Sequence, residues 1–511
     1  MKRILLAFAF AVVIALPISA QVDTAWVRRY NGPGNSWDWP LAMAIDARGN
    51  ICVTGFSYGI GTDRDFATIK YYPNGDTAWV RRYNGPRNAE DVANAIAIDD
   101  SGNIVVTGCS KGTGTDYDFL TIKYKANGDM AWVRRYNGPG NNVDIAYDLA
   151  IDRFDYVYVT GVSVEIGTGE EDVATIKYYP DGETCWVRRY NGPDNFGYAP
   201  RAIAIDGYGN ALVVGMTESG EGSWPDYLTI KYRPDGTTVW VRTFDAADNI
   251  RAEARAVVAD RYDNVYVTGH SVNIDTGEYY STIKYDGYGG LAWTRSYSGS
   301  GMATDIAIDS SGDIVETGYG TGSGPSYDYV TTKYHPNGDT VWRRAYGTPG
   351  NLMDEATGLS LDQAGNVYVT GVSAYYTGKD NYTTVKYLPN GDVAWVQDYD
   401  GPVNSYDHAT DIAADRFGNV YVTGYSAQSN VDPYNYDYAT IKYVQYKSGD
   451  VNADSELTIS DIVYLINYVL KNGPSPNPLG SGDVNCDGDV AIADIIYLIN
   501  YLFKSGPKPV C

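Results

Sequence analysis

Short runs of alternating apolar and polar residues, separated by turn residues, fill most of the chain. The alternation is clear in residues 157–160 (VYVT) and 174–178 (ATIKY), where β-branched and aromatic side chains predominate. Such runs predict strands, because successive side chains of a strand point to opposite faces. Asn-Gly pairs such as Asn74-Gly75 and Asn127-Gly128 follow many runs and tolerate the positive φ of tight hairpins.

These runs belong to a repeated unit that opens on a tryptophan. The repeated residues, roughly 53 positions apart, are Trp26, Trp79, Trp132, Trp186, Trp240, Trp293, Trp342 and Trp395. Each unit continues from AWVRRYNGP through segments like AIAID and GNVYVTG to ATIKYYPNGDT, and eight copies lie within residues 21–443. Four short strands per unit at this period predict an all-β fold, an eight-bladed β-propeller with four-stranded blades.

The order of the segments predicts how the ring closes. With AIAID as the inner strand and AWVRRY as the outer one, residues 25–30 have no blade before them. The last copy, residues 411–443, has only three strands. We therefore expect the N-terminal strand to complete the last blade, which removes exposed sheet edges. The repeated tryptophan is expected to be an apolar wedge between blades, not part of a ligand site.

The blades resemble SBBP repeats, the repeat of bacterial extracellular β-propellers. The resemblance rests on the DxxGNxYVTG pattern of residues 46–55, 362–371 and 415–424. It implies the fold and an extracellular location more than it implies an activity. That family is usually described as seven-bladed, whereas the count here is eight.

A second pattern begins after residue 448. Oxygen-bearing side chains fall at positions 1, 3, 5 and 12 of two loops that start 33 residues apart, which is the spacing of EF-hand loops. The two loops predict two calcium ions. Because calcium needs six or more oxygens, we expect the main-chain carbonyl at position 7 of each loop to contribute as well. The predicted metal ligands are Asp450, Asn452, Asp454, Glu456, Asp461, Asp483, Asn485, Asp487, Asp489 and Asp494.

Each loop leads into an amphipathic segment, residues 461–474 and 494–507, that ends in Gly-Pro. We predict a small all-α domain in which two helices bury one face against each other. The module resembles a type I dockerin, which has a DVNxDGxxxxxD loop followed by one helix, in duplicate. This resemblance implies calcium-dependent binding to a cohesin, steered by loop positions 10 and 11. Those positions hold Ile459, Ser460, Ile492 and Ala493.

These four residues depart from the Ser-Thr pair of well-studied cellulosomal dockerins. We therefore expect the partner to be a cohesin-like or another surface protein. Net charge supports this class of partner, because a chain of charge −24 is a poor match for nucleic acid.

The first residues predict export. Lys2 and Arg3 precede an apolar run, residues 4–16, and a small residue at the cut site. We expect a Sec-type signal peptide at 1–20, the propeller at 21–443, a linker at 444–449 and the dockerin-like domain at 450–511. An extracellular or cell-surface location with no membrane span follows.

The five cysteines fall into two groups. Cys486 and Cys511 bracket the last loop and helix, where an oxidising compartment allows them to pair. Cys52, Cys109 and Cys185 occupy different places in their repeats and are expected to be buried thiols.

One face of the predicted propeller carries loops of variable length, GPGNxxD and the loop after VTG. Variable loops on a rigid scaffold favour binding, so we expect a glycan or protein ligand there. Its acidic and aromatic residues are Trp37, Trp39, Tyr58, Asp65, Asp91, Tyr117, Asp118, Asp144, Trp224, Asp226, Tyr375, Tyr376 and Asp407. The aspartates repeated at one position are expected to cap turn amides. They are Asp65, Asp118, Asp172, Asp226, Asp328 and Asp437.

The sequence contains no sialidase Asp-box, nucleophile elbow or HExxH motif. We therefore expect a secreted binding protein that its dockerin attaches to a scaffold, without catalytic residues. One alternative is an extracellular carbohydrate-active enzyme of polysaccharide catabolism delivered by its dockerin. Another is a structural surface-layer or adhesion component.

Overall fold

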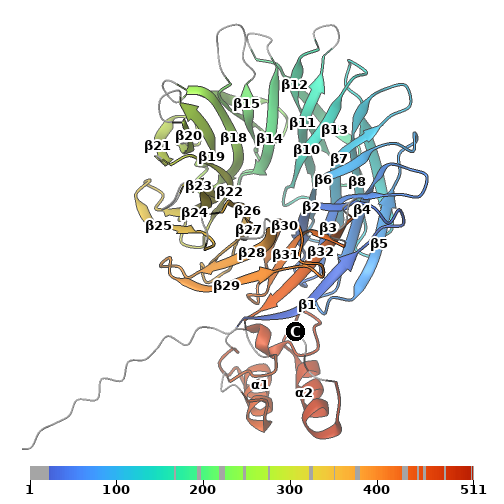
Figure 1. The fold of residues 1–511 in the computed structure, drawn as a ribbon, viewed down its shortest axis with the longest axis vertical. Helices are drawn as coiled ribbons and strands as arrows, with labels where there is room; N and C mark the ends of the chain where they lie inside the picture. Colours follow the sequence, from blue (N-terminus) through green and yellow to red (C-terminus); the bar gives the residue numbers. More distant parts are fainter. Residues whose placement is uncertain are drawn as a thin grey trace, which may run out of the picture.

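The computed structural model is a ring of β-sheets with a small helical module beside it (Figure 1). The described residues are 22–165, 169–192, 197–217, 225–245, 249–273, 277–297, 299–321, 326–349, 352–374, 380–428, 435–445, 448–452, 456–476, 479–507 and 509. Within them, 32 strands form eight four-stranded antiparallel sheets, the blades of a propeller. The predicted eight blades are confirmed.

Each blade runs from an inner strand near the ring axis to an outer strand. The inner strands are β2 (Asp38–Ile45), β6 (Asp91–Ile98), β10 (Asp144–Ile151), β14 (Tyr198–Ile205), β18 (Asn249–Ala259), β22 (Gly301–Ile308), β26 (Asp354–Leu361) and β30 (Asp407–Ala414). The second strands are β3 (Ile51–Tyr58), β7 (Ile104–Lys111), β11 (Val157–Val164), β15 (Ala211–Thr217), β19 (Val265–Asn273), β23 (Ile314–Thr321), β27 (Val367–Ala374) and β31 (Val420–Ala427).

The outer half of each blade holds two further strands. The third strands are β4 (Arg64–Tyr71), β8 (Tyr117–Tyr124), β12 (Glu171–Tyr178), β16 (Tyr227–Tyr232), β20 (Gly277–Tyr285), β24 (Tyr327–Tyr334), β28 (Asp380–Tyr387) and β32 (Tyr436–Val444). The outer strands are β5 (Thr77–Tyr83), β9 (Met130–Tyr136), β13 (Thr184–Tyr190), β17 (Thr238–Phe244), β21 (Leu291–Tyr297), β25 (Thr340–Tyr346), β29 (Val393–Tyr399) and, for the last blade, β1 (Asp23–Tyr30). We number the blades 1 to 8 in this order.

The N-terminal strand closes the ring. β1 pairs antiparallel with β32, so that Val27 lies opposite Ile441. Blade 8 therefore takes three strands from the end of the propeller sequence and one from its start. This confirms the closure predicted from residues 25–30.

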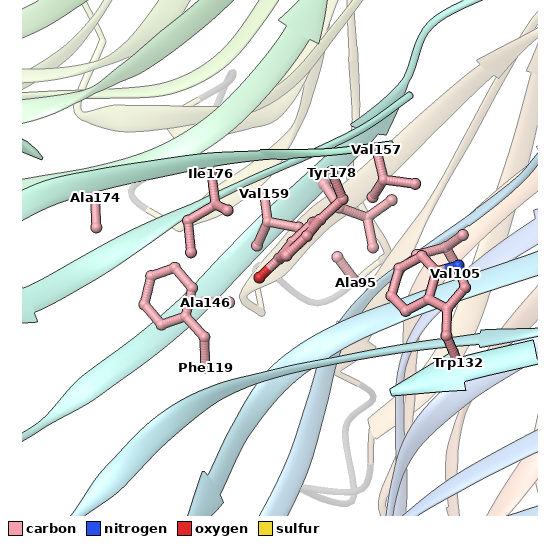
Figure 2. Packing of buried hydrophobic residues seen from close by; sticks show 11 residues of the cluster. Ala95, Val105, Phe119, Trp132, Ala146, Val157, Val159, Ala174, Ile176 and Tyr178 are labelled. Atoms are coloured by element: carbon pink, nitrogen blue, oxygen red, sulfur yellow. The ribbon is translucent and has the colours of Figure 1, made fainter. Parts of the chain in front are cut away.

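Apolar side chains fill the space between neighbouring blades. Between blades 2 and 3, the rings of Trp132 and Tyr178 lie 5.9 Å apart, in a cluster with Phe119, Val157 and Ile176 (Figure 2). Seven of the eight repeated tryptophans are buried, and Trp293 is half-buried. The repeated tryptophan is thus the wedge that its apolar surroundings predicted.

Hydrogen bonds from the same outer strand hold the next blade. Trp132 Nε1 donates to the carbonyl oxygen of Pro180 at 3.0 Å, and Arg134 Nε donates to that of Gly182 at 2.6 Å. Gly182 has a φ of 86°, and a Cβ there would lie 2.7 Å from Trp132 Cδ2, so the turn needs glycine. The equivalent arginine–glycine pairs are Arg28–Gly75, Arg81–Gly128, Arg188–Gly236, Arg242–Gly289, Arg295–Gly338 and Arg344–Gly391.

Blade 8 differs at this contact because its outer strand comes from the start of the chain. Its third strand runs on toward the C-terminal module instead of turning back. Trp395 of blade 7 therefore donates to the side-chain oxygen of Gln445 at 3.2 Å. The residue two positions after Trp395 is Gln397 and not arginine. Ring closure explains this departure from the repeat.

The C-terminal module holds the helices α1 (Ile459–Lys471) and α2 (Ile492–Lys504) and a short 3-10 helix, η1 (Leu479–Gly482). Leu465 and Leu498 are fully buried in a core shared by α1 and α2. No helix in the described ranges is long and apolar enough to cross a membrane. The predicted signal peptide lies outside these ranges.

Candidate functional site

The second predicted calcium loop, residues 483–494, bends around its own carboxylates. The Asp483 carboxylate accepts hydrogen bonds from the backbone amides of Asp487 and Gly488 at 3.2 and 3.1 Å. Asp494, at the start of α2, is fully buried and accepts from the amide of Ala491 at 2.8 Å. Asp494 also accepts from the amides of Val484 and Asn485 at 2.9 and 3.3 Å, so position 12 lies against the start of the loop.

The acids of this loop repel one another. Burial, together with the charges of Asp494 and Asp487, raises the pKa of Asp483 to about 7. Oxygen ligands that crowd together in this way suit a divalent cation, which would relieve their repulsion. Among the described residues, no three acidic, histidine or cysteine side chains already converge as a metal site.

The first loop, residues 450–461, has the same frame. Asp461 is fully buried at the start of α1 and accepts from the amides of Val451 and Thr458 at 3.0 and 2.8 Å. Asp494 does the same with Val484 and Ala491 in the second loop. Asp454, predicted to be a ligand at position 5, lies outside the described residues.

Both helices also expose a matched row of apolar side chains. Spacings of four and seven residues place each row on one helix face, away from the shared core. The rows are Ile459, Val463 and Leu470 on α1 (62%, 51% and 59% exposed) and Ile492, Ile496 and Phe503 on α2 (54%, 53% and 63% exposed).

The predicted partner residues lie at the head of these rows. Ile459 and Ile492 begin them, and Ser460 and Ala493 are exposed beside them. The other four members were not predicted, although an apolar residue outside the core face of each helix was a visible signal. A helix that is apolar on two faces has one face to offer a partner.

Aromatic rings gather on the variable-loop face where blades 8 and 1 meet. The ring of Trp39 lies 4.0 Å from that of Tyr425 and 6.2 Å from that of Phe56. Trp37, which is 38% exposed, lies 6.1 Å from Tyr436. We call these five rings the aromatic patch. The sequence indicated only the two tryptophans, because blade 8 joins the two ends of the propeller sequence.

His408 lies beside the aromatic patch. Its ring stacks on Tyr425 at 5.0 Å and 12°. Its Nε2 atom is 2.9 Å from the carboxylate of Asp380, and both side chains are partly exposed. This pair was not predicted, since nothing in the repeat brings residues 380 and 408 together.

Most of the predicted acidic residues of this face are structural. Asp91, for example, is buried and accepts from the amide of Gly85 at 2.5 Å. Asp144 and Asp407 accept equivalent bonds. Tyr117 donates to Glu90, which also pairs with Arg64 over the ring of Tyr58. The predicted residues Trp224, Tyr375 and Tyr376 lie outside the described ranges.

The aspartates repeated at one position were expected to cap turns, and four of them have a different main partner. Each forms an ion pair with an arginine of the outer strand in its own blade. The pairs are Asp65–Arg82, Asp118–Arg135, Asp172–Arg189 and Asp437–Arg29, at 2.6–3.2 Å. At Asp226 the equivalent outer-strand residue is Thr243, and burial raises the pKa of Asp226 to about 6. In the blade that holds Asp328, the equivalent outer-strand residue is Ala345.

Comparison with protein families identifies both parts of the chain. The dockerin type I domain model matches residues 448–503, which span both loops and both helices. The chain carries a type I dockerin. The SBBP beta-propeller repeat model matches residues 131–163, 341–374 and 403–430 in the ring. The composition inferred from the two sequence patterns is therefore confirmed.

Known structures resemble this chain only weakly. No curated protein sequence matches the chain. A polysaccharide lyase matches with 10% identity and a TM-score of 0.42, over 71% of this chain and 92% of its own. Drosophila Plexin A, in complex with Semaphorin 1b, matches with 8% identity and a TM-score of 0.41, over 84% and 89%. An alpha-L-arabinofuranosidase from Fusarium graminearum matches with 9% identity and a TM-score of 0.38, over 57% and 91%.

The dockerin rests on the short-turn face of the propeller (Figure 1). Arg416, between β30 and β31, donates to the carbonyl oxygen of Gly488 and lies 3.2 Å from the Asp489 carboxylate. A Cβ on Gly488 would lie 2.9 Å from the carbonyl oxygen of Arg48, between β2 and β3. The dockerin and the aromatic patch therefore lie on opposite faces of blades 8 and 1.

The cysteines divide as expected, as far as the structure describes them. Cys486 in the second dockerin loop is disulfide-bonded, and its predicted partner Cys511 lies outside the described residues. Cys52, Cys109 and Cys185 are free thiols; Cys52 and Cys109 are buried as predicted, whereas Cys185 is only half-buried. Burial raises the pKa values of Cys52 and Cys109 to about 12, which keeps these thiols unreactive.

Proposed function

We propose that this protein is a secreted binding protein whose dockerin attaches it to a scaffold while its propeller holds a glycan or protein ligand. Dockerin type I domains bind calcium and cohesin-type partners and occur in extracellular proteins. The observation that carries the proposal is the placement of the two sites on opposite faces. A partner bound to the dockerin would leave the aromatic patch open.

The dockerin would bind two calcium ions, one in each loop. We propose that Asp450, Asn452, Asp454, Glu456 and Asp461 hold one ion and that Asp483, Asn485, Asp487, Asp489 and Asp494 hold the other. Each ion would fix the start of one helix, because the side chains at positions 1 and 12 of a loop would then bind the same ion. The exposed rows on α1 and α2 would then meet a cohesin-type partner, with Ile459, Ser460, Ile492 and Ala493 at one end.

The aromatic patch of the propeller would bind its ligand by stacking. Aromatic rings present large, rigid surfaces that suit both sugar rings and protein partners. Trp37 is exposed, and Trp39 and Tyr436 are half-buried at the edge of the aromatic patch. We favour a glycan, because adjacent flat rings on a rigid scaffold match the flat faces of successive sugars.

Affinity electrophoresis of the full-length chain in gels containing different polysaccharides tests this end. We expect at least one polysaccharide to retard the wild type, and Trp37→Ala or Trp39→Ala to reduce the retardation. Tyr288→Ala, which removes a 91% exposed ring from a hairpin on the opposite face, is the matched control. Equal retardation of wild type and both tryptophan variants would remove the aromatic patch as the ligand surface.

A carbohydrate-active enzyme is the second candidate, and one observation favours it. His408 and Asp380 form a hydrogen-bonded pair beside the aromatic patch, a geometry that can move a proton. Release of reducing sugar from a polysaccharide that binds, lost in His408→Gln with binding retained, would establish this activity. Binding without any turnover would leave the binding protein as the function.

A further inference from the structure

Three arginines break the repeat on the inner strands of blades 4 and 5. Arg201 lies on β14, and Arg251 and Arg255 lie on β18. All three pair with Glu253, from Arg201 Nε at 2.6 Å, Arg251 Nη2 at 3.1 Å and Arg255 Nε at 3.1 Å. We call these four residues the arginine cluster.

The other blades use this strand position differently. Where blades 4 and 5 have Arg201 and Arg255, blade 2 has Asn94 and blade 6 has Thr304. Asn94 and Thr304 donate to a carbonyl oxygen of the next inner strand, at 2.7 and 3.0 Å, and so join neighbouring blades. The arginines meet a carboxylate instead. At this inner-strand position, blades 4 and 5 therefore lack, within the described residues, the blade-to-blade hydrogen bond to a carbonyl oxygen that Asn94 and Thr304 form.

The arginine cluster has more donors than its one carboxylate can satisfy. Burial raises the pKa of Glu253, but the charges of Arg255 and Arg201 lower it by more, so the carboxylate is ionised. Its single negative charge lies among the three positive charges of the arginines. Arg255 Nε is buried and makes no hydrogen bond with acceptable geometry in the described structure. His270, opposite Glu253 on β19, is only 7% exposed, and its Nδ1 also lacks a partner there.

His270 does not add to this charge. Burial lowers the pKa of His270 to about 4, and the three arginines oppose its protonation. It is neutral near pH 7 and contributes an unpaired ring nitrogen. Within the arginine cluster and His270, the buried atoms without a hydrogen-bond partner among the described residues are Arg255 Nε and His270 Nδ1.

Solvent reaches the arginines although Glu253 is fully buried. The side chains of Arg201, Arg255 and Arg251 are 28%, 35% and 50% exposed. The guanidinium group of Arg201 lies over the ring of Tyr147 at 5.5 Å, which fixes its plane. Planar guanidinium groups match the oxygens of a carboxylate or sulfate. The arginine cluster is a local excess of positive charge in a chain of net charge −24.

We propose that the arginine cluster binds the acidic group, a carboxylate or a sulfate, of an anionic polysaccharide. The proposal rests on the glycan-binding role proposed above and names the chemical class of the glycan. Arg201 and Arg255, whose side chains are 28% and 35% exposed, hold the acidic group. Arg251, at the loop end of β18, extends the site toward the face that carries the aromatic patch, four blades away around the ring.

Isothermal titration calorimetry of the full-length chain tests the site. The probes are a galacturonate hexasaccharide, a sulfated galactan hexasaccharide, neutral maltohexaose and hexaglutamate. We expect one or both acidic saccharides to bind more tightly than the other two probes. Added salt should weaken the binding of the acidic saccharides. Arg251→Met and Arg255→Met should each weaken this binding about ten-fold. Arg87→Gln, an exposed arginine on the same face, is the matched control and should bind like the wild type.

The thermal unfolding of each variant shows whether it is folded, and half-exposed Arg251 offers the safer substitution. Unchanged affinity in a folded Arg251→Met or Arg255→Met variant would overturn the site. Tighter binding of hexaglutamate than of either acidic saccharide would also overturn it, in favour of a protein partner. Binding of neutral sugars without acidic preference would remove this site and keep the proposed glycan-binding role, whereas failure of all saccharides would remove both this site and that role.

Discussion

Single side chains link each blade to the next. The repeated tryptophan and the arginine two residues after it donate to the hairpin of the following blade, as Trp132 and Arg134 do to Pro180 and Gly182. This explains why the WVR and NGD segments recur together although they lie nearly a blade apart in sequence. The periodicity of tryptophan predicted a wedge. The hydrogen bonds were not predictable, because their acceptors are main-chain atoms of another copy.

Replacing Trp132 with alanine should destabilise the propeller by about 3–5 kcal/mol, because it leaves a cavity between blades 2 and 3 and removes the bond to Pro180. Urea unfolding followed by far-UV circular dichroism measures this loss. Trp37→Ala, at an exposed position, is the control and should change the unfolding free energy little. Equal stability of the two variants would show that the wedge does not hold the blades.

Three inner-strand aspartates should make the protein more stable in mild acid. Burial raises the pKa values of Asp148 and Asp305 to about 6 and that of Asp411 to about 7. Because these values exceed the unfolded value of 3.8, folding favours the protonated carboxyls. Their stabilising effect is lost as the pH rises through 6 to 7.

The calcium-free full-length chain should therefore unfold at a higher temperature at pH 5 than at pH 8. Asp411→Asn should reduce this difference, since it removes the titrating group with the highest of the three pKa values. The amide keeps one acceptor for the backbone amides of Met43 and Ile412, so the variant is less stable at pH 5. An unfolding temperature that rises between pH 5 and pH 8 would contradict the assignment.

The strands and helices each had a clear sequence signal. Period-two alternation gave the strands, and the missing outer strand of the last copy gave the closure by β1. The dockerin helices followed from their apolar spacing, and the calcium loops from the spacing of acidic residues within a few positions. The aromatic patch was only half visible, because it joins residues of β2 and β3 to residues of β31 and β32 from the far end of the propeller.

Deleting residues 22–30 should open the ring. β32 then exposes the edge that β1 covers, and exposed edges pair with other chains. We expect size-exclusion chromatography to show oligomers or aggregate in place of a monomer. A synthetic peptide of residues 22–31 should restore the monomer, and a peptide of scrambled sequence should not. A stable monomer without β1 would show that closure does not depend on this strand.

Asp494→Asn should remove one of the two calcium ions that we propose for the dockerin. The carboxylate lies at position 12 of the second loop, and its charge and second oxygen contribute most to binding there. Isothermal titration calorimetry with calcium should give two sites in the wild type and in Asp129→Asn, an exposed hairpin control. It should give one site in Asp494→Asn. Two unaltered sites in that variant would place the ion elsewhere.

At the scale of the whole molecule, the proposed attachment site and the proposed recognition site lie apart. The dockerin rests on the short turns of blades 8 and 1, and the aromatic patch lies at the variable-loop ends of the strands of the same blades, on the opposite face. The repeat predicted two unlike faces. It did not predict where the dockerin rests. That depends on Arg416, which no motif distinguishes, and on Gly488, which the dockerin motif marks only as a loop glycine.

Attachment by calcium is the central claim, and biolayer interferometry against a panel of immobilised cohesin modules tests it most directly. The full-length chain should bind at least one module in millimolar calcium and dissociate in chelator. Val463→Asp combined with Ile496→Asp should abolish the binding, because it places charge in both exposed rows, whereas Ile60→Asp on the propeller should not. Binding that persists in chelator, or that survives the double substitution, would contradict the account.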